Sequence, residues 1–394
     1  MINRSFILEN SAEFLNAMKL RKHTLDIQQL VALLSQETKL ISQLQQAYRA
    51  RKLIANTSQN RTEGKEIADQ IINLKIELDN CSKILHPLLA SIPAIPDISV
   101  QPEELLIKTW GEKQKIQSLC HTTYSKLDFA SASVISGSKF VYLIKEVATL
   151  HRALIQYMLD QHIAQGYMEL YVPYLVQQES VYRSGQLPNL EHAMYKTDDN
   201  HYLIPTGEAS LVNILPFLKQ PLPIKLVTSS PCFRKEIGAY GALHKGLIRQ
   251  HQFEKVELVQ CVPHADQGDK ALMDMVNAGC NILEKLQLPY RILQLRGDDM
   301  GFAATKTLDI EVWMPGQNRY VEISSCSLCG DFQSRRMKFK YEGAYPITLN
   351  ASGLAIGRTL AALIENHTDD KGILHLPLAL QSYLPFSTLD LNNL

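Results

Sequence analysis

The chain has no excess of charge of either sign. Its 394 residues include 40 Lys and Arg against 40 Asp and Glu, so the formal net charge at pH 7 is zero. A strongly basic protein attracts nucleic acid through its overall field. The balanced charge excludes that mode, and any contact with RNA must come from a local patch.

Long apolar runs are also missing. No run reaches the roughly eighteen apolar residues that mark a membrane-spanning helix. The first residues, MINRSFILENSAEF, lack the apolar core and the small-residue cleavage site of a signal peptide. We therefore expect a cytoplasmic protein with no membrane partner.

The seven cysteines do not form a disulfide framework. They are odd in number and scattered along the chain, at positions 81, 120, 232, 261, 280, 326 and 329. Disulfide scaffolds are typical of short secreted chains with an even number of cysteines. Cys326 and Cys329 form a lone Cys-x-x-Cys pair, and no second pair completes the ligand set of a zinc site. We predict that both are structural.

A glycine-rich phosphate loop between a strand and a helix is absent as well. The P-loop and the Rossmann nucleotide fold both depend on such a loop, because its backbone must approach the phosphates closely. The sequence therefore excludes both, and a nucleotide would need another kind of platform.

Two helical patterns occupy the first hundred residues. Residues 25–55 carry an apolar stripe at Leu30, Leu33, Leu40, Leu44 and Ala47. After the polar stretch 56–64, a heptad seam of alternating spacings follows, at Ile67, Ile71, Leu74, Leu78, Cys81, Leu85 and Leu88. The two patterns predict an antiparallel coiled-coil hairpin over about residues 27–90. Pro87 falls in its last turn, and Ser91–Pro102 reads as a stiff linker.

The outer end of this hairpin is basic. Five basic residues stand near its turn against the single acid Glu63: Arg49, Arg51, Lys52, Arg61 and Lys65. Neutralising backbone phosphates supplies most of the affinity for RNA. The patch therefore fits an RNA contact, but an ordinary solvated coiled-coil surface fits equally well, and these residues alone leave both open.

From about residue 105 onward, the hydrophobic pattern shows both helix-like and strand-like segments. A helix is predicted over Leu150–Ala164, followed by a strand over Met168–Leu175 that contains Pro173. Further strands are predicted at Leu203–Pro205, Leu226–Ser229, Asp309–Met314 and Arg319–Ser325, the last two joined by a turn over residues 315–318. Because hairpins dominate, we expect an α+β fold with an antiparallel sheet.

One long hairpin concentrates functional groups. It reads SPCFRKEIGAYGALHKGLIRQHQFEKVE, two strands joined by a polar loop. Alternation would place Arg234 and Glu236 on one face of the first strand, and Phe253, Lys255 and Glu257 on one face of the second. A guanidinium group binds phosphate or carboxylate, a ring stacks on a base, and a carboxylate holds an amine. The set fits a nucleotide and an amine-bearing substrate.

Four segments resemble, in order, the motifs of one family. FRKE with GLIRQHQFEKVE resembles motif 2 of the class II aminoacyl-tRNA synthetases, specifically the seryl-tRNA synthetases. LIPTGEASL resembles their serine-binding loop, RYVEISSCSLCGDFQSRRM their metal and ATP segment, and LNASGLAIGRTLAALIEN their motif 3. The match covers nearly the whole chain. It implies a class II catalytic domain over residues 105–394, an antiparallel sheet flanked by helices, after an N-terminal tRNA-binding domain over residues 1–100.

The resemblance also assigns individual residues to ATP. Arg234 would clamp the α-phosphate and the substrate carboxylate, and Arg358, in a helix that includes Ser352, would hold the γ-phosphate. Adenine would stack on Phe253, with Glu236 accepting from its amino group. Glu322 and Ser325 would ligate Mg²⁺, although alternation does not place positions three apart on one face. The remaining ATP positions are Lys235, Gln250, His251, Gln252, Ile323 and Ser324.

The other implied site binds serine. Its positions are Thr206, Gly207, Glu208, Arg234, Glu257 and Ser352. A carboxylate that accepts the substrate hydroxyl would discriminate against alanine, which leaves that charge unpaired. The helix–strand unit around Pro173 resembles motif 1, which implies a homodimer.

The implied activity is ATP-dependent activation of L-serine to seryl-adenylate, with Mg²⁺, and transfer to the 3′ end of tRNA(Ser); tRNA(Sec) stays open as a second acceptor. The substrate carboxylate is itself the nucleophile, so catalysis would rest on positioning and charge stabilisation.

The motif 2 loop GAYGALHKG lacks the usual Arg-Asp pair. A paralogue that activates serine or a similar small amino acid for a carrier protein or biosynthetic partner is therefore the alternative. A non-catalytic RNA-binding descendant is a third reading, and the intact phosphate-binding arginines argue against it.

Overall fold

The computed structural model describes residues 2–55, 61–114, 120–237 and 246–393. The chain divides into two compact units, Met1–Ile95 and Pro96–Leu394. Each is described by itself below.

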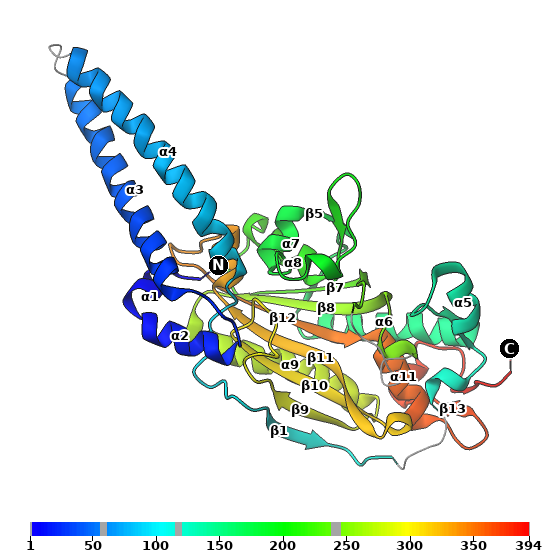
Figure 1. The fold of residues 1–394 in the computed structure, drawn as a ribbon. Helices are drawn as coiled ribbons and strands as arrows, with labels where there is room; N and C mark the ends of the chain where they lie inside the picture. Colours follow the sequence, from blue (N-terminus) through cyan, green and yellow to red (C-terminus); the bar gives the residue numbers. More distant parts are fainter. Residues whose placement is uncertain (1, 56–60, 115–119, 238–245, 394) are drawn as a thin grey trace. The chain divides into compact units, whose positions relative to one another are not determined.

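The first unit is helical (Figure 1). Two short helices, α1 (Arg4–Glu9) and α2 (Ser11–Leu20), precede two long ones, α3 (Ile27–Ala55) and α4 (Arg61–Ser91). The long pair forms the predicted antiparallel hairpin, here called the arm. Its seam buries Leu40, Ala47, Ile71, Leu74 and Cys81. At the last turn of α4 the fully buried residue is Leu89, while the predicted seam residue Leu88 is only half-buried.

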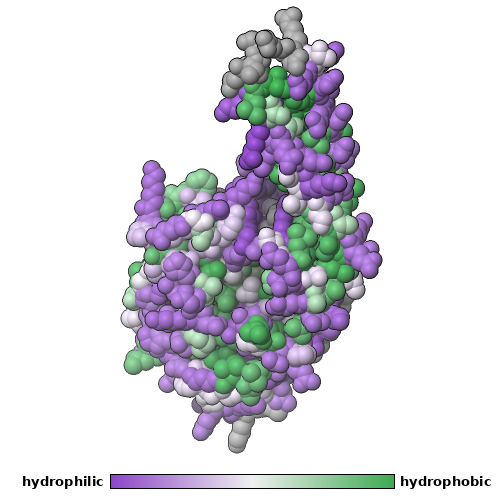
Figure 2. Space-filling model, turned by 90° about the vertical axis from the view of Figure 1, so that its left-hand side faces the viewer, coloured by the Kyte–Doolittle hydropathy of each residue, from purple (hydrophilic) through white to green (hydrophobic). Residues whose placement is uncertain are grey.

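Hydrophilic side chains cover most of the visible face of the arm, with apolar side chains among them (Figure 2). The exposed apolar residues of α4 include Ile72, Ile76 and Ile84. Because one stripe of each helix is buried in the seam and the rest faces water, the arm shows the pattern of a two-helix coiled coil.

The second unit is built on one eight-stranded sheet (Figure 1). Its strands run in the spatial order β1 (Leu105–Trp110), β9 (Tyr290–Gln294), β10 (Lys306–Met314), β11 (Arg319–Gly330), β12 (Ile347–Ala355), β8 (Gln252–Val262), β7 (Ile224–Phe233) and β4 (Met168–Glu169). The pair β4–β7 is parallel and the other neighbours are antiparallel. The α+β fold with an antiparallel sheet is therefore confirmed.

Helices pack against this sheet. The longest are α6 (Glu146–Ala164), α9 (Gly268–Lys285) and α11 (Ile356–His367). Gly279 of α9 lies so close to Ile310 of β10 that an added Cβ would stand 2.9 Å from its Cδ1. Successive strand residues point to opposite faces, so Asp309 points away from α9. The face that carries Asp309 is the one on which the site described below is built.

Shorter elements complete the unit. They are α5 (Phe129–Ser136), α7 (Gln178–Ser184), α8 (Glu208–Ile214), α10 (Phe332–Met337), α12 (Leu378–Gln381), and the small strand pairs β2 (Leu127–Asp128) with β3 (Tyr142–Leu143), β5 (Leu175–Gln177) with β6 (His201–Leu203), and β13 (Ile373–His375) with β14 (Thr388–Asp390). Two 3₁₀ turns matter below, η1 (His121–Thr123) and η5 (Gly246–Ile248).

Three local predictions were wrong. The expected strand Met168–Leu175 is split, because β4 joins the large sheet whereas β5 pairs with β6, and Pro173 between them has no N–H for a ladder. Ser352 lies in β12, not in the helix that begins at Ile356. The small residues that follow it are compatible with a helix, but they belong to strand β12.

The third wrong prediction concerns Arg234 and Glu236. Strand β7 ends at Phe233, so the two residues do not share a strand face by alternation. Glu236 has a positive φ of 45°, a conformation that a regular strand does not contain. The directions of the Arg234 and Glu236 side chains are therefore set by the turn that follows β7 and not by strand alternation.

Cys326 and Cys329 are buried in β11 and carry free thiols. Within the described residues, the structure contains no helix that combines the length and apolar character needed to cross a membrane.

Candidate active site

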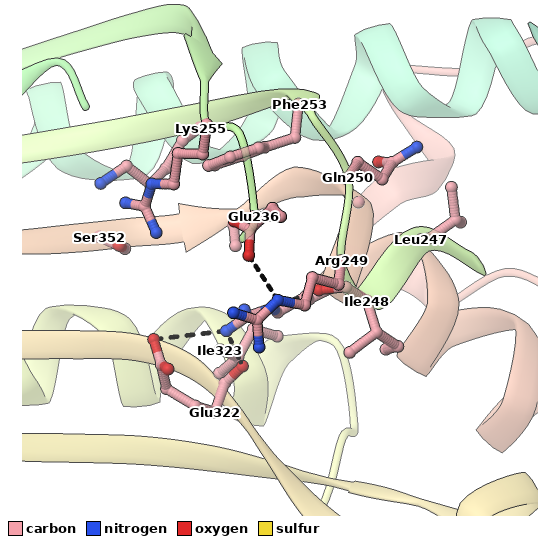
Figure 3. A pocket seen from close by; sticks show the side chains of 14 residues that line it. Glu236, Leu247, Ile248, Arg249, Gln250, Phe253, Lys255, Glu322, Ile323 and Ser352 are labelled. Atoms are coloured by element: carbon pink, nitrogen blue, oxygen red, sulfur yellow. Dashed lines mark hydrogen bonds and ion pairs between the residues drawn. The ribbon is translucent and has the colours of Figure 1, made fainter. Parts of the chain in front are cut away.

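A pocket brings together residues from the separate motifs (Figure 3). Seven of the predicted ATP positions line it: Arg234, Glu236, Gln250, Phe253, Glu322, Ile323 and Arg358. Ser352, predicted for serine, lines it as well. These residues come from β7 and its following turn, β8, β11, β12 and the start of α11. Positions more than a hundred residues apart in sequence therefore share one cavity.

A β-bulge in β11 brings the predicted metal ligands Glu322 and Ser325 to the same face of the sheet, although they are three positions apart. Glu322 lies opposite Glu311 and Ser324 lies opposite Ile310, so Ile323 is an extra residue. Cross-strand partners share a face, and the extra residue shifts the alternation by one. Ser325, opposite Asp309, consequently returns to the face of Glu322.

A second irregularity works in the same way in β12. Ser352 lies opposite Glu257 and Ala355 lies opposite Lys255, with one residue too many between them. Ser352 and Ala355 thus share the face of the two β8 residues, and both line the pocket.

Arg358 lies on α11 and contacts residues of both η5 and β11. It stands in the first turn of α11, where the helix dipole adds positive potential. Its Nε donates to the carbonyl of Ile248 at 3.1 Å, and its guanidinium donates to the backbone carbonyl of Glu322 at 2.6 Å. Oε1 of Glu322 lies 3.3 Å from Nη1 of Arg358. Burial acts to raise the pKa of Glu322, but the charges of Arg358 and Arg234 hold it below its ordinary value.

Arg234 contacts both the loop before α8 and the ring of Phe253. Its Nε donates to the carbonyl of Pro205 at 3.0 Å, in the loop before α8. Its guanidinium carbon lies 5.2 Å from the centroid of the Phe253 ring. A cation over a ring face is attracted to it, so Arg234 and Phe253 stabilise each other's position in the pocket.

Glu236 is held by an ion pair with Arg249, drawn in Figure 3. Sequence reasoning missed Arg249, although it lies in the same motif, because a lone arginine in a loop carries no signal of its partner. Lys255, placed on the functional face of the hairpin but given no ligand in the prediction, also lines the pocket. The pocket residues that the prediction did not name are Leu247, Ile248, Ala355 and Gly357.

Thr206, Lys255 and Glu257 form a buried polar cluster. The Thr206 hydroxyl donates to Oε2 of Glu257 at 2.6 Å and accepts from Nζ of Lys255 at 2.8 Å. Lys255 also forms an ion pair with Glu257. Gly207 lies against this cluster, and a Cβ there would stand 3.0 Å from the Cβ of Glu257. Close packing, not a special φ, explains why a small residue suits position 207.

Glu208 begins α8 and is buried among amides. Its carboxylate accepts from Gln333 at 2.6 Å, from Asn350 at 2.8 Å and from Gln186 at 3.2 Å. Burial, followed by the negative charge of Glu257, raises the pKa of Glu208 to about 7, although the Gln333 hydrogen bond opposes the rise. Gln186, Gln333 and Asn350 were not predicted, because amides scattered over three elements show no common pattern in sequence.

The predicted metal ligands stand beside a third oxygen donor. Asp309 is the cross-strand partner of Ser325, and its Oδ1 is buried without a hydrogen-bond partner within the described residues. Burial and the nearby charge of Glu322 raise the pKa of Asp309. An all-oxygen set with an unsatisfied carboxylate oxygen is the kind of donor set that Mg²⁺ accepts.

Five predicted ATP residues do not line the pocket: Ser325, described above as a predicted metal ligand, and four others. Ser324 is fully buried and donates to the carbonyl of Ser352 at 2.6 Å, and His251 contacts the backbone of Arg234. Lys235 lies over the ring of Tyr195, and Gln252 lines a neighbouring cavity with Phe253. Their predicted roles stay predictions.

The predicted RNA-binding residues lie on the arm. Arg49, Arg51 and Lys52 on α3 and Lys65 on α4 are exposed. Arg61 begins α4, but its side chain lies outside the described part of the chain. The motif 2 loop is likewise outside it over residues 238–245.

Comparison with known proteins agrees with this geometry. Residues 192–367 match the family model "tRNA synthetase class II core domain (G, H, P, S and T)". The chain is 39% identical to a serine--tRNA ligase of Francisella philomiragia, with 98% of each chain covered. The chain belongs to the serine--tRNA ligase family.

Further relatives support the membership. A serine--tRNA ligase of Nitrosococcus oceani is 42% identical over 81% of this chain and 79% of its own length. The solved seryl-tRNA synthetase of Pyrococcus horikoshii, complexed with ATP, superposes with a TM-score of 0.91 at 27% identity over the full length of both chains. The resemblance seen in four sequence motifs therefore extends through the fold of a serine--tRNA ligase, and the class II fold is confirmed.

Proposed function

We propose that this protein activates L-serine with ATP and transfers it to tRNA(Ser). The observation that carries this is the pocket itself, in which Arg234, Phe253, Glu322 and Arg358 surround one cavity beside the buried Thr206–Glu257 cluster. A nucleotide and a small amino acid with one hydroxyl would each find matching groups there.

In the first step, a carboxylate oxygen of serine attacks the α-phosphorus of ATP. A phosphorus–oxygen bond forms, the α–β bridging bond breaks, and pyrophosphate leaves. The phosphorus centre gathers negative charge, and Arg234, which lines the pocket, is the residue proposed to stabilise that charge. Arg358, held between Ile248 and Glu322, suits the terminal phosphate. In the second step a ribose hydroxyl of the tRNA attacks the acyl carbon and AMP leaves.

The serine subsite is assigned from charge and size. Glu208 and Glu257 are the buried acids that can hold the ammonium and accept from the substrate hydroxyl, and Ser352 lies opposite Glu257 on the same face. Alanine would leave a buried acceptor without its donor, which costs far more than a lost contact.

Glu322 and Ser325, with Asp309 beside them, are the residues proposed to hold Mg²⁺. Bound there, the ion would neutralise phosphate charge.

We assign the arm to tRNA through its exposed basic residues Arg49, Arg51, Lys52 and Lys65, with Arg61, so that residues 1–100 form the tRNA-binding domain and residues 105–394 the catalytic domain. The alternative, a paralogue serving a carrier protein, is not favoured, because the full-length relatives are serine--tRNA ligases.

A homodimer is also proposed. Strand β1 lies at the edge of the large sheet and exposes Leu105, Leu106 and Ile107. An edge strand with exposed apolar side chains can pair with a strand of another chain. In a two-fold dimer, β1 of one subunit could pair antiparallel with β1 of the other.

Two assays test the function. Serine-dependent pyrophosphate exchange measures activation, and charging of tRNA(Ser) transcripts measures transfer. We expect both with serine and neither with alanine. Exchange without charging would favour the carrier-protein alternative, and no exchange with any amino acid would contradict the proposal.

A further inference from the structure

A buried pair lies behind the nucleotide pocket and is not used by the chemistry above. His121, in η1, and Glu365, in the last turns of α11, have no solvent-exposed side-chain surface. Nδ1 of His121 lies 2.7 Å from Oε1 of Glu365. Nε2 of the same ring accepts a hydrogen bond from the backbone N–H of Leu247 at 3.2 Å. The ring therefore bridges α11 and the first residues of η5.

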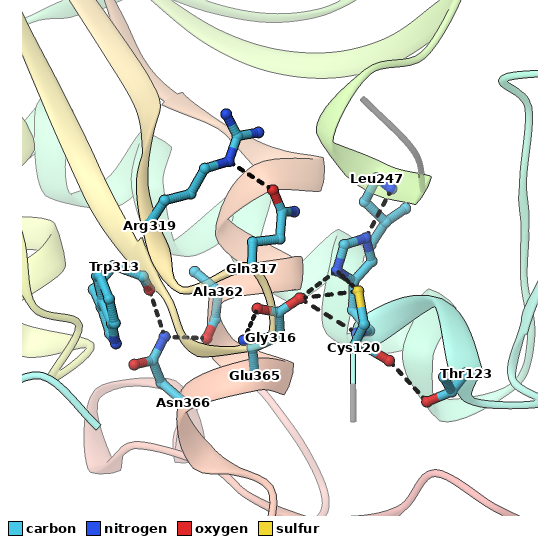
Figure 4. Close-up of polar contacts among 11 residues, drawn as sticks. Cys120, Thr123, Leu247, Trp313, Gly316, Gln317, Arg319, Ala362, Glu365 and Asn366 are labelled. Atoms are coloured by element: carbon cyan, nitrogen blue, oxygen red, sulfur yellow. Dashed lines mark hydrogen bonds and ion pairs between the residues drawn. The ribbon is translucent and has the colours of Figure 1, made fainter. Parts of the chain in front are cut away.

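The partners of Glu365 are all donors. In addition to His121, the thiol of Cys120 lies 3.4 Å from Oε1, and the N–H of Gly316 donates to Oε2 at 3.0 Å. Figure 4 shows this carboxylate between Cys120 and the Gly316 turn. A carboxylate surrounded by donors is suited to the ionised, acceptor-only form.

The contacts also define the state of the ring. Because Leu247 N–H needs a lone pair on Nε2 and Glu365 needs a proton on Nδ1, the contacts fit the neutral Nδ1–H tautomer. Burial lowers the pKa of His121, but the contacts with Cys120 and Glu365 outweigh burial and raise the pKa to about 9. The geometry at Nε2 favours the neutral ring all the same, because a second ring proton there would point at the Leu247 N–H, 3.2 Å away.

The link continues into the pocket through the backbone. Leu247 is followed by Ile248, whose carbonyl accepts from Nε of Arg358. Arg358 and Glu365 are seven residues apart on α11, two turns along one side of the helix. The same helix thus holds η5 at two points, directly through Arg358 and indirectly through Glu365 and His121.

Two glycines show that this arrangement is built into the surrounding chain. A Cβ on Gly246 would lie 2.3 Å from Nε2 of His121, and Gly246 has a φ of 69°. A Cβ on Gly316 would lie 3.0 Å from Oε2 of Glu365 and 3.1 Å from Cα of Cys120. Neither position has room for a side chain while the pair is in place.

We propose that His121 and Glu365 are positioning residues for the nucleotide site. By holding the Leu247 N–H they fix η5, so that the Ile248 carbonyl keeps the Arg358 guanidinium aimed at the triphosphate. The proposal rests on the proposed function, since it assigns a role within that reaction. It predicts an effect on ATP and not on serine, because the serine residues Glu208, Glu257 and Ser352 lie on α8, β8 and β12, which do not contact the His121 ring.

The test compares two replacements of one ring. His121→Asn retains a donor near Glu365 but has nothing that reaches Leu247, whereas His121→Gln can place an oxygen close to the Nε2 position. In pyrophosphate exchange with the full-length protein, we expect His121→Asn to raise the KM for ATP by about tenfold, the scale of one unsatisfied buried donor. The KM for serine should stay within about twofold, and His121→Gln should recover most of the loss.

A double-mutant cycle separates positioning from general packing. If His121 acts through Arg358, the effects of His121→Asn and Arg358→Lys on the KM for ATP should be strongly non-additive. Thr123→Ala is the matched control, because Thr123 lies on the same turn but bonds only the Cys120 carbonyl in the described structure. Should His121→Asn not fold, Glu365→Asp, which shortens the acceptor, is expected to give the same selective rise.

Equal effects of Asn and Gln, parallel changes in both KM values, or additive effects in the cycle would overturn the proposal. Absence of exchange in the unmodified protein would instead reject the proposed function, so the two failures are distinguishable.

Discussion

Thr206 and Glu257 are 51 residues apart in sequence, and the hydroxyl of one donates a 2.6 Å hydrogen bond to the carboxylate of the other. Lys255 contacts both from the same strand face. One loop and one strand thus form a compact polar wall beside the pocket. Because the wall is buried, each of its charges depends on the others, and small changes should have large and specific effects.

Replacing Glu257 tests this wall. Glu257→Gln keeps the shape but removes the charge that accepts from Thr206 and pairs with Lys255. We expect the KM for serine in pyrophosphate exchange to rise at least about a hundredfold, since hydrogen bonds to buried charges are worth ~1.5–3 kcal/mol each. ATP affinity, measured by calorimetry without serine, should change little. Normal exchange at ordinary serine concentration would remove Glu257 from the serine site.

The acidity of Glu208 predicts a pH dependence. Its pKa is raised to about 7 from an ordinary 4.5, so the ionised form is lost as pH falls through neutrality. If the carboxylate binds the serine ammonium, the KM for serine should rise by up to about tenfold for each pH unit below 7. The KM for ATP should be much flatter, and Glu208→Gln should remove the slope.

The same shift has a consequence for stability of the opposite sense. Between pH 4.5 and 7 the folded state binds more protons at Glu208 than the unfolded state does. The free energy of unfolding should therefore fall as pH rises through this window. Denaturant titrations of the parent and of Glu208→Gln at several pH values check this. A parent that gains stability relative to the variant with rising pH would contradict it.

Phe253 is expected to carry the adenine. Phe253→Ala should raise the KM for ATP by a factor of roughly 5 to 150, because base–aromatic stacking is worth ~1–3 kcal/mol. Phe253→Tyr keeps the ring face and is the control. Initial rates of exchange over a range of ATP concentrations measure both. A Tyr variant as weak as the Ala variant would mean that packing, not stacking, decides the effect.

The arm should act only in tRNA charging. Replacing Arg49, Arg51 and Lys52 by alanine should raise the KM for tRNA and flatten its salt dependence, because fewer counterions are displaced. Pyrophosphate exchange should stay normal. The control replaces Lys39, Lys75 and Lys83, which are also exposed on the arm. Equal effects of both triple variants would assign the result to total charge and not to the basic end.

The edge strand β1 makes the homodimer testable. Leu106→Lys places a charge on a strand whose apolar side chains are about half exposed, and it should shift the protein toward a monomer in sedimentation velocity. Val134→Lys, on the exposed surface of α5, is the control. An unchanged sedimentation coefficient for Leu106→Lys would place the interface elsewhere.

Much of this protein follows from local pattern. The heptad seam of the arm and the alternation of Phe253, Lys255 and Glu257 depend only on the periods of helix and strand, which sequence displays directly. Four ordered motifs also indicated the family, and the resemblance implied ATP, serine and tRNA as its substrates, while the residue types alone indicated only a nucleotide and an amine-bearing molecule.

Other features were decided by tertiary structure. The bulge at Ile323 brings Glu322 and Ser325 to one face, and no local rule shows where a strand gains an extra residue, because its partner strands set the register. The turn after β7 directs Arg234 and Glu236, and Ser352 joined a strand because β8 and β11 were there to pair with it. The amides around Glu208 and the His121–Glu365 pair meet only when distant elements pack. Sequence therefore determined which groups this protein has, and packing between strands and helices decided which of them meet.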